Sequence, residues 1–411
     1  MHSNSNNFIG YAGLKSNVNT LNAEFFSNIK GINLCNYEGR FPQRVPRLGF
    51  FEELEIFDNA THKGLFELKN LIKSKLNTNE RISLVQRNCI HSLLRLGDFE
   101  TIQSLDINNM SYDNDFLKLE ILLVKITNNL TINLSNQEDF AEKDFLKFSS
   151  QTLRANIPIL KKIEYLNRVV VTLCRYSKYD AYKNEVHQLV EYIIKNLTQF
   201  NTKDKYDLFV LSIIYRGVAM AYKSPIVDTP KFLGLSLQYA LEANDDNEDS
   251  FFNILTRENL YTLYLTLYKY HLNESNDKDA FFYYEKMNEL DPNDSTHHTE
   301  AGMYFVNKDL PKQAKPFFLK AIKSGPPAMA MNHYFLGLCY QNSSQYNKFI
   351  YNMKRSMEYD PLAITPVWEL LIYYKASKDT YNYHYYKEFI LNNKNLMEQL
   401  EDEELTMLIK G

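Results

Sequence analysis

The chain has 411 residues, of which 46 are Lys or Arg and 50 are Asp or Glu, so its net charge is −4. This balance argues against a nucleic-acid-binding protein, because such proteins normally carry a basic stripe. Its cysteines, Cys35, Cys89, Cys174 and Cys339, lie far apart without CxxC spacing, which argues against a zinc site and against a disulfide framework.

The N-terminus and the hydropathy pattern predict neither a secretory signal nor a membrane helix. Residues 1–7 have no basic region and no apolar region of the kind that a signal peptide needs. No apolar run reaches the roughly 20 residues that cross a bilayer. We therefore expect a cytoplasmic protein without membrane insertion.

Residues 1–58 are the least regular part of the chain. Asn, Ser and Gly are frequent, and Pro42 and Pro46 interrupt any helix. Aromatic side chains nevertheless recur from Phe8 to Phe51, more than a plain disordered tail would carry. We interpret this stretch as an irregular N-terminal arm that caps the first helix of the body. The alternative is a docking peptide for a partner.

Residues 59–200 carry apolar stripes at helical spacing, separated by short polar joins. The predicted helices cover about 80–96, 115–127, 140–153, 159–176 and 181–197. They alternate with joins as helical hairpins do, but no fixed offset repeats between them. We therefore expect degenerate helical repeats in this region.

Residues 201–396 show a sharper pattern with a fixed period. Pro292, Pro326 and Pro361 fall 34 and 35 residues apart. Gly302 and Gly337 each stand twenty-four residues before the proline that closes their own hairpin. Proline cannot continue a helix interior, so it separates one hairpin from the next. The period therefore predicts consecutive hairpins of one kind.

This pattern resembles the tetratricopeptide repeat, in which small residues, aromatics and a closing proline recur every 34 residues. The best copy runs from His333 to Tyr340 and from Tyr351 to Pro361. The resemblance implies an all-α fold, an α-solenoid of helical hairpins in a right-handed superhelix. Residues 397–411 are expected to form an acidic C-terminal tail or capping helix.

The repeat phase also predicts where helices approach each other closely. Gly302 and Gly337 stand on first helices, while Ala314 and Ala321 stand on the facing second helix. Small residues at these offsets leave room for large neighbours. All four are expected at helix–helix contacts.

No catalytic constellation, cofactor motif or metal site is predicted. The chain has no phosphate loop, GxGxxG, HExxH or GxSxG motif. His297 and His298 stand near Glu300, but adjacent helical residues do not share a face. The start of a first helix is normally exposed, so we expect surface histidines there. The Tyr-rich helix around Tyr383 is interpreted as core, with stacking on bases or sugars as the alternative.

In tetratricopeptide repeats the first helix of each hairpin lines a concave groove. The repeat phase assigns nine residues of this chain to that groove: Leu265, Lys269, Asn273, Thr299, Met303, Asn307, Tyr334, Leu338 and Asn342. The three asparagines share one repeat position, and an amide can donate to and accept from a peptide backbone. The alternative is that asparagine is simply favoured at helix ends.

The sequence therefore favours a non-catalytic scaffold or adaptor that holds a protein or peptide partner in its groove. Two alternatives stay open: a cytoplasmic receptor for a short signalling peptide, and an enzyme or enzyme subunit whose site the sequence does not reveal. The family's clamp for chaperone C-terminal carboxylates needs Lys and Arg at groove positions, which the second and third clear hairpins lack. A homo-oligomer is compatible with all of these readings.

Overall fold

A computed structural model describes residues 142–176, 181–222, 224–244, 251–292, 294–325, 328–361 and 363–397, with scattered residues at 104–126 and 399–408. Within these ranges every regular element is a helix, as the sequence predicted. The expected N-terminal arm, the expected helix at 80–96 and most of the one at 115–127 lie outside the described residues. The chain divides into two compact units, one reaching Asp291 and the other starting at Pro292.

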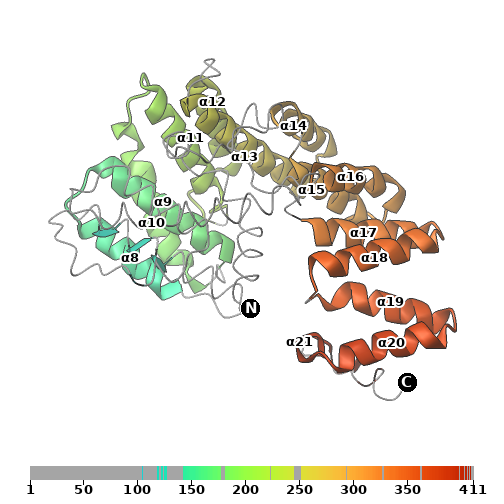
Figure 1. Ribbon diagram of the computed structural model, residues 1–411. Coiled ribbons are helices and arrows are strands. Elements are labelled where there is room, and N and C mark those ends of the chain that lie inside the picture. Colours follow the sequence, from blue (N-terminus) through green and yellow to red (C-terminus); the bar gives the residue numbers. More distant parts are fainter. Residues whose placement is uncertain are drawn as a thin grey trace, which may run out of the picture. The chain divides into compact units, whose positions relative to one another are not determined.

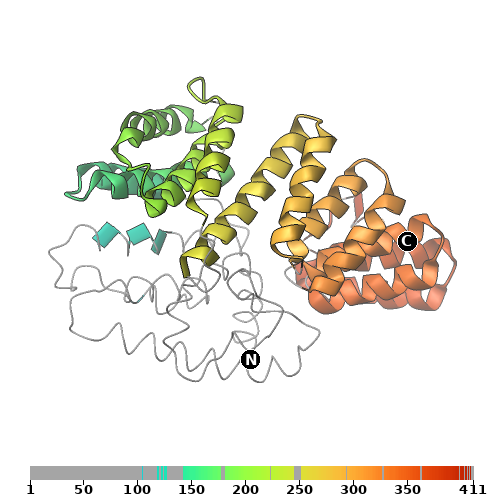
Figure 2. The ribbon, with the colours of Figure 1, turned by 90° about the horizontal axis from the view of Figure 1, so that it is seen from above.

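The first unit is a series of helices in which neighbours in the sequence pack together. α8 packs on α9, α9 on α10, α11 on α12 and α13 on α14, and Figures 1 and 2 both show α13 beside α14. The helices that the structure describes in this unit from residue 142 onward, with one short 3-10 helix, are α8 (Glu142–Arg154), α9 (Ile159–Tyr176), α10 (Lys183–Asn196), η4 (Leu197–Gln199), α11 (Lys205–Ala219), α12 (Thr229–Ala243), α13 (Phe251–Asn273) and α14 (Asp277–Leu290).

Between residues 294 and 397, the described part of the second unit forms three hairpins followed by a short helix (Figure 1). α15 packs on α16, α17 on α18 and α19 on α20, while α16 also packs on α17 and α18 on α19. Stacking of this kind is how helical repeats bury a continuous core. The bounds are α15 (Ser295–Asn307), α16 (Pro311–Ser324), α17 (Met329–Asn342), α18 (Tyr346–Tyr359), α19 (Ile364–Ala376), α20 (Thr380–Leu391) and α21 (Lys394–Met397).

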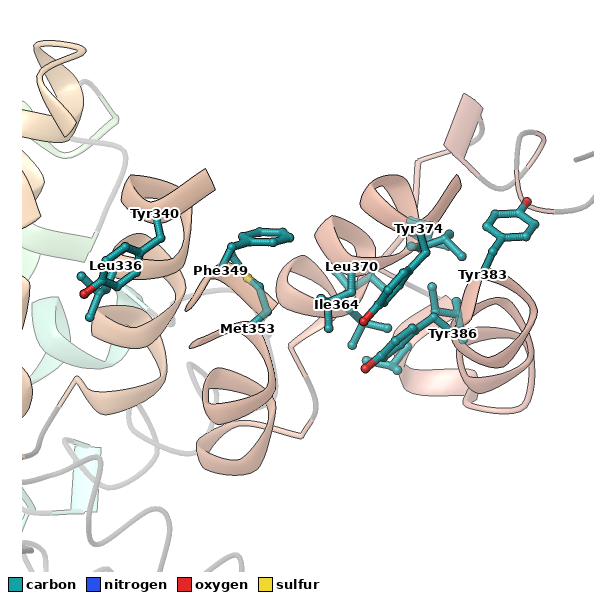
Figure 3. Packing of buried hydrophobic residues seen from close by; sticks show 14 of the residues in the cluster. Leu336, Tyr340, Phe349, Met353, Ile364, Leu370, Tyr374, Tyr383 and Tyr386 are labelled. Atoms are coloured by element: carbon teal, nitrogen blue, oxygen red, sulfur yellow. The ribbon is translucent and has the colours of Figure 1, made fainter. Parts of the chain in front are cut away.

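One hydrophobic core runs through the second unit (Figure 3). Its buried side chains extend from Ala314 on α16 to Leu408 near the C-terminus. Phe318 and Phe349 are fully buried in it, and the Tyr374 ring stacks on Tyr386 with centroids 5.7 Å apart. Each hairpin therefore depends on its neighbour for the burial of its apolar face.

The helix starts follow from the local sequence. The side chain of Asp204 accepts a hydrogen bond from the Asp207 amide, and that of Asp228 accepts from the Lys231 amide. An aspartate before the first turn satisfies amides that have no partner inside the helix. α12 begins at Thr229, and Pro230 fits its first turn, because the missing N–H and the fixed φ of proline suit that position.

Candidate functional site

The predicted groove positions of the second unit lie on the first helices α15 and α17. Met303, Tyr334 and Leu338 are half-buried, and each packs in part on the hydrophobic core. Asn307 and Asn342 are exposed, each at the last residue of its helix. Each of the two helices thus presents a half-buried apolar segment followed by an exposed amide.

Thr299 has a different environment from the other groove positions. Its side chain is only 5% exposed. Its hydroxyl oxygen lies 2.9 Å from the Ser295 carbonyl oxygen and 2.9 Å from Asn332 Oδ1 on α17. Thr299 therefore links the first helices of two adjacent hairpins.

Leu265, Lys269 and Asn273 lie on α13 of the first unit. Leu265 is half-buried, whereas Lys269 and Asn273 are exposed. This is the same progression from apolar to polar along the helix as on α15 and α17. A surface shared with the six residues of the second unit stays a prediction.

Glu369 on α19 is a further residue at the same repeat position, 35 residues after Tyr334. It is half-buried, and burial raises the pKa of its carboxyl. Burial also raises the pKa of Tyr334, and the charge of Glu369 adds to that rise. The two side chains are thus near enough for their charges to interact. Extending the repeat offset by one hairpin would have identified Glu369.

The expectation that His297 and His298 are exposed is wrong. Their side chains are 0% and 3% exposed. Asp294, itself fully buried, accepts from the Thr296 amide at 2.7 Å, so the first turn of α15 is an interior feature. Burial lowers the pKa of His298 to about 4, and the charge of Lys320 lowers it further. The charge of Asp294 and a hydrogen bond with the Pro292 backbone raise it, but by less.

Burial favours the neutral form of His298 and of His333. His333 shares a 2.9 Å hydrogen bond with Asn352 Oδ1, and its ring stacks on Tyr359 with centroids 5.6 Å apart. Burial lowers the pKa of His333 as well. Among the described residues no group of three His, Cys, Asp or Glu side chains could hold a metal ion.

The cysteines within the described ranges are free thiols of low reactivity. Burial raises the pKa of Cys174 to about 12. Burial raises the pKa of Cys339 to about 11, although Lys315 acts the other way. A nucleophilic cysteine needs a lowered pKa, so neither residue is suited to catalysis.

The Tyr-rich helix α20 has a buried and an exposed face. Tyr383 and Tyr386 are buried and lie in the core (Figure 3), as the sequence predicted. Tyr381 and Tyr385 are 80% and 56% exposed. The prediction of core tyrosines is therefore confirmed for one face of the helix.

None of the described helices is both long enough and apolar enough to cross a bilayer. No protein-family profile matches the chain, and no curated protein matches it.

Solved structures with a similar course of the chain have low identity to it. The MamA RS-1 ArsTM double mutant is 21% identical, with 46% of this chain and 93% of that chain covered and a TM-score of 0.33. The human IFIT1 dimer with PPP-AAAA is 14% identical, with 83% of this chain and 80% of that chain covered and a TM-score of 0.42. The APC/C hetero-tetramer Cut9-Hcn1 is 13% identical, with 85% of this chain and 87% of that chain covered and a TM-score of 0.30.

Likenesses at these levels say nothing about a ligand, because one fold hosts many functions. The helical hairpins and their packing describe an all-α solenoid of the tetratricopeptide-repeat type.

Proposed function

We propose that this chain is a non-catalytic scaffold that binds a segment of a protein partner along the first helices of its hairpins. The observation that carries the proposal is the repeated surface on α15 and α17. On both helices, half-buried apolar side chains lead to an exposed asparagine at the same repeat position. Repeat proteins commonly bind partners on surfaces that their repeats build up in this way.

The chemistry of this surface suits an extended peptide segment. Met303, Tyr334 and Leu338 offer apolar area for partner side chains. The amides of Asn307 and Asn342 can each donate to and accept from a partner backbone. Glu369 adds a half-buried carboxylate at the next hairpin, where it would accept hydrogen bonds from the partner.

The test compares two double variants in partner capture. Asn307→Ala with Asn342→Ala removes both groove amides. Asn347→Ala with Asn392→Ala removes two exposed amides on α18 and at the end of α20. Proteins retained by the wild-type chain are identified by mass spectrometry and then titrated calorimetrically. A buried hydrogen bond that loses one partner costs about 1–3 kcal/mol, so the groove variant should bind roughly tenfold or more weakly.

The control variant should bind like the wild-type chain, and both variants should keep the wild-type circular dichroism spectrum. Unchanged affinity in the groove variant would place the partner site elsewhere on the molecule. Retention of a short free peptide instead of a protein would favour a peptide receptor over a scaffold.

A further inference from the structure

Six lysines gather where the first helix of each hairpin in the second unit turns into the second helix. Figure 1 shows the α17–α18 and α19–α20 turns on the same side of this unit. Lys315 is half-buried and the others are exposed. We name this set the lysine edge, and its members are Lys308, Lys312, Lys315, Lys348, Lys375 and Lys378.

The lysine edge has few carboxylates of its own. Asp309 and Asp379 are the acidic residues within the same turns. Asp379 is engaged at the start of α20, where it accepts from the Asn382 backbone amide at 3.1 Å and from Asn382 Nδ2 at 2.7 Å. Within the part of the chain that the structure describes, none of the six lysines forms an ion pair.

Two of these lysines are held around a single aromatic ring. Lys315 Nζ from α16 and Lys348 Nζ from α18 each lie 5.2 Å from the centroid of the Tyr340 ring on α17. The two ammonium groups are therefore separated by at most twice that distance, comparable with the roughly 8 Å screening length at physiological salt. Lys348 also donates to Gln345 Oε1 at 3.0 Å. An anionic group bound near Tyr340 would be attracted by both charges.

The same arrangement of lysine over tyrosine recurs at the other turns. Lys308 lies 5.3 Å from the Tyr304 ring centroid, and Lys375 lies 5.8 Å from that of Tyr383. A cation over the face of an aromatic ring is attracted by the ring quadrupole. The rings thus hold at the surface ammonium groups that form no ion pair within the described residues.

Aromatic contacts make the edge continuous from hairpin to hairpin. The rings of Tyr346 at the start of α18 and Tyr373 near the end of α19 have centroids 5.3 Å apart. Tyr346 is also 44% exposed, which leaves apolar area between the cations. Near the opposite end of α18, Arg355 pairs with Glu358.

We propose that the lysine edge is a docking surface for an acidic polypeptide segment, whose carboxylates bind at Lys315 and Lys348. The surface is distinct from the groove, and the proposal does not depend on the function proposed for the groove. A protein segment fits better than a nucleic acid, because two of the three rings beneath the cations, Tyr340 and Tyr383, are only 8% exposed. Binding of single strands relies on exposed rings that stack on bases.

The experiment measures fluorescence anisotropy with the full chain and three labelled probes. These are a Glu-rich peptide, the same peptide with Gln in place of Glu, and an oligothymidylate. The edge variant is Lys315→Gln with Lys348→Gln. The matched control is Lys323→Gln with Lys354→Gln, which changes the same charge near the other ends of α16 and α18, where both lysines are exposed. A third variant, Lys315→Arg with Lys348→Arg, keeps the charge.

We expect the Glu-rich peptide to bind, the Gln peptide not to bind, and affinity to fall as salt rises. The edge variant should bind about three- to tenfold more weakly, as the loss of two exposed ion pairs predicts. The control and arginine variants should retain binding. Equal weakening by the edge and control variants, or no binding of the Glu-rich peptide at low salt, would overturn the proposal. Tighter binding of the oligothymidylate through the same lysines would assign the surface to nucleic acid instead.

Discussion

At the scale of single residues, small side chains decide how closely the helices approach. A Cβ atom added to Gly302 would lie 2.7 Å from the Phe318 ring, and one added to Gly337 would lie 2.8 Å from Met353 Cε. Ala314 and Ala321 are fully buried. Gly302 and Gly337 therefore stand at helix–helix contacts, as the repeat phase predicted, and the two alanines lie in the interior.

The contrast between two glycines gives a direct prediction. Gly302→Ala should destabilise the fold by about 1–2 kcal/mol, because overpacking against the buried Phe318 ring exceeds the gain in helix propensity. Gly234→Ala should stabilise it by up to about 1 kcal/mol, because a Cβ at Gly234 would meet nothing within 4 Å. Urea unfolding of both variants measures the difference. A Gly302→Ala protein as stable as the Gly234→Ala protein would contradict the packing described for α15 and α16.

Gly337→Leu is a larger insertion, and it should lower the free energy of unfolding by roughly 1–3 kcal/mol.

His298 predicts how stability depends on pH. Its pKa falls from the ordinary value of 6.5 to about 4 on folding. Between pH 6.5 and 4 the unfolded chain therefore binds a proton at this histidine while the folded chain does not. The contribution of neutral His298 to the free energy of unfolding is fully present above pH 6.5. This contribution is lost as the pH falls from 6.5 towards 4, and the loss is on the order of 3 kcal/mol.

The measurement is urea unfolding at several values between pH 4 and 7.5 for the wild-type chain and for His298→Gln. The variant should depend less steeply on pH. It should keep the part that comes from His333, whose pKa burial also lowers. The same slope in both proteins would show that His298 does not titrate in this way.

The residues that the sequence did not reveal depend on contacts between hairpins. The hydrogen bond from Thr299 to Asn332 arises only when α15 and α17 lie side by side. The pairing of Lys315 and Lys348 on one ring likewise needs three helices in register. A periodic pattern predicts which face of a helix is inside, but not which polar partner a neighbouring repeat supplies.

At the scale of elements, the turns inside the hairpins repeat with the same spacing and the same backbone conformation. No sequence motif marks them, however. Ser275, Asp309, Ser344 and Lys378 all have φ between 56° and 60° and follow one another at 34, 35 and 34 residues. In each, the next amide bonds back to a carbonyl five residues earlier, as from Gln345 to Tyr340 at 2.9 Å. Glycine is the usual residue at such a helix end. Because other residues stand here, the turns could not be recognised from glycines.

Helix bounds were more predictable than turns. The apolar spacing predicted a helix at 159–176, and α9 spans Ile159–Tyr176. The start of α12 is harder to predict, because Pro230 suggests a loop while its fixed φ also suits a first helical turn. The apolar period therefore locates helix bodies well, whereas their ends depend on local capping.

At the scale of the whole molecule, the sequence and the structure mark different boundaries. The sequence pattern sharpens near residue 201, where the offsets of the repeat begin, and a domain at 201–396 stays a prediction. The structure divides between Asp291 and Pro292. A solenoid is stabilised by each repeat and by contacts between neighbours. A change in sequence regularity therefore need not coincide with a division between compact units.

The division predicts that residues 292–411 fold by themselves. The core from Ala314 to Leu408 lies entirely within this fragment. The fragment also holds three hairpins, α15–α16, α17–α18 and α19–α20, and about three repeats are enough for a stable array. We expect a helical circular dichroism spectrum and a cooperative urea transition. The fragment should also bind the Glu-rich peptide as tightly as the full chain, because all six lysines of the edge belong to it. Residues 329–411, which lack α15 and α16, serve as the comparison and should unfold at lower urea. A fragment 292–411 without helical structure would show that the second unit needs the first in order to fold.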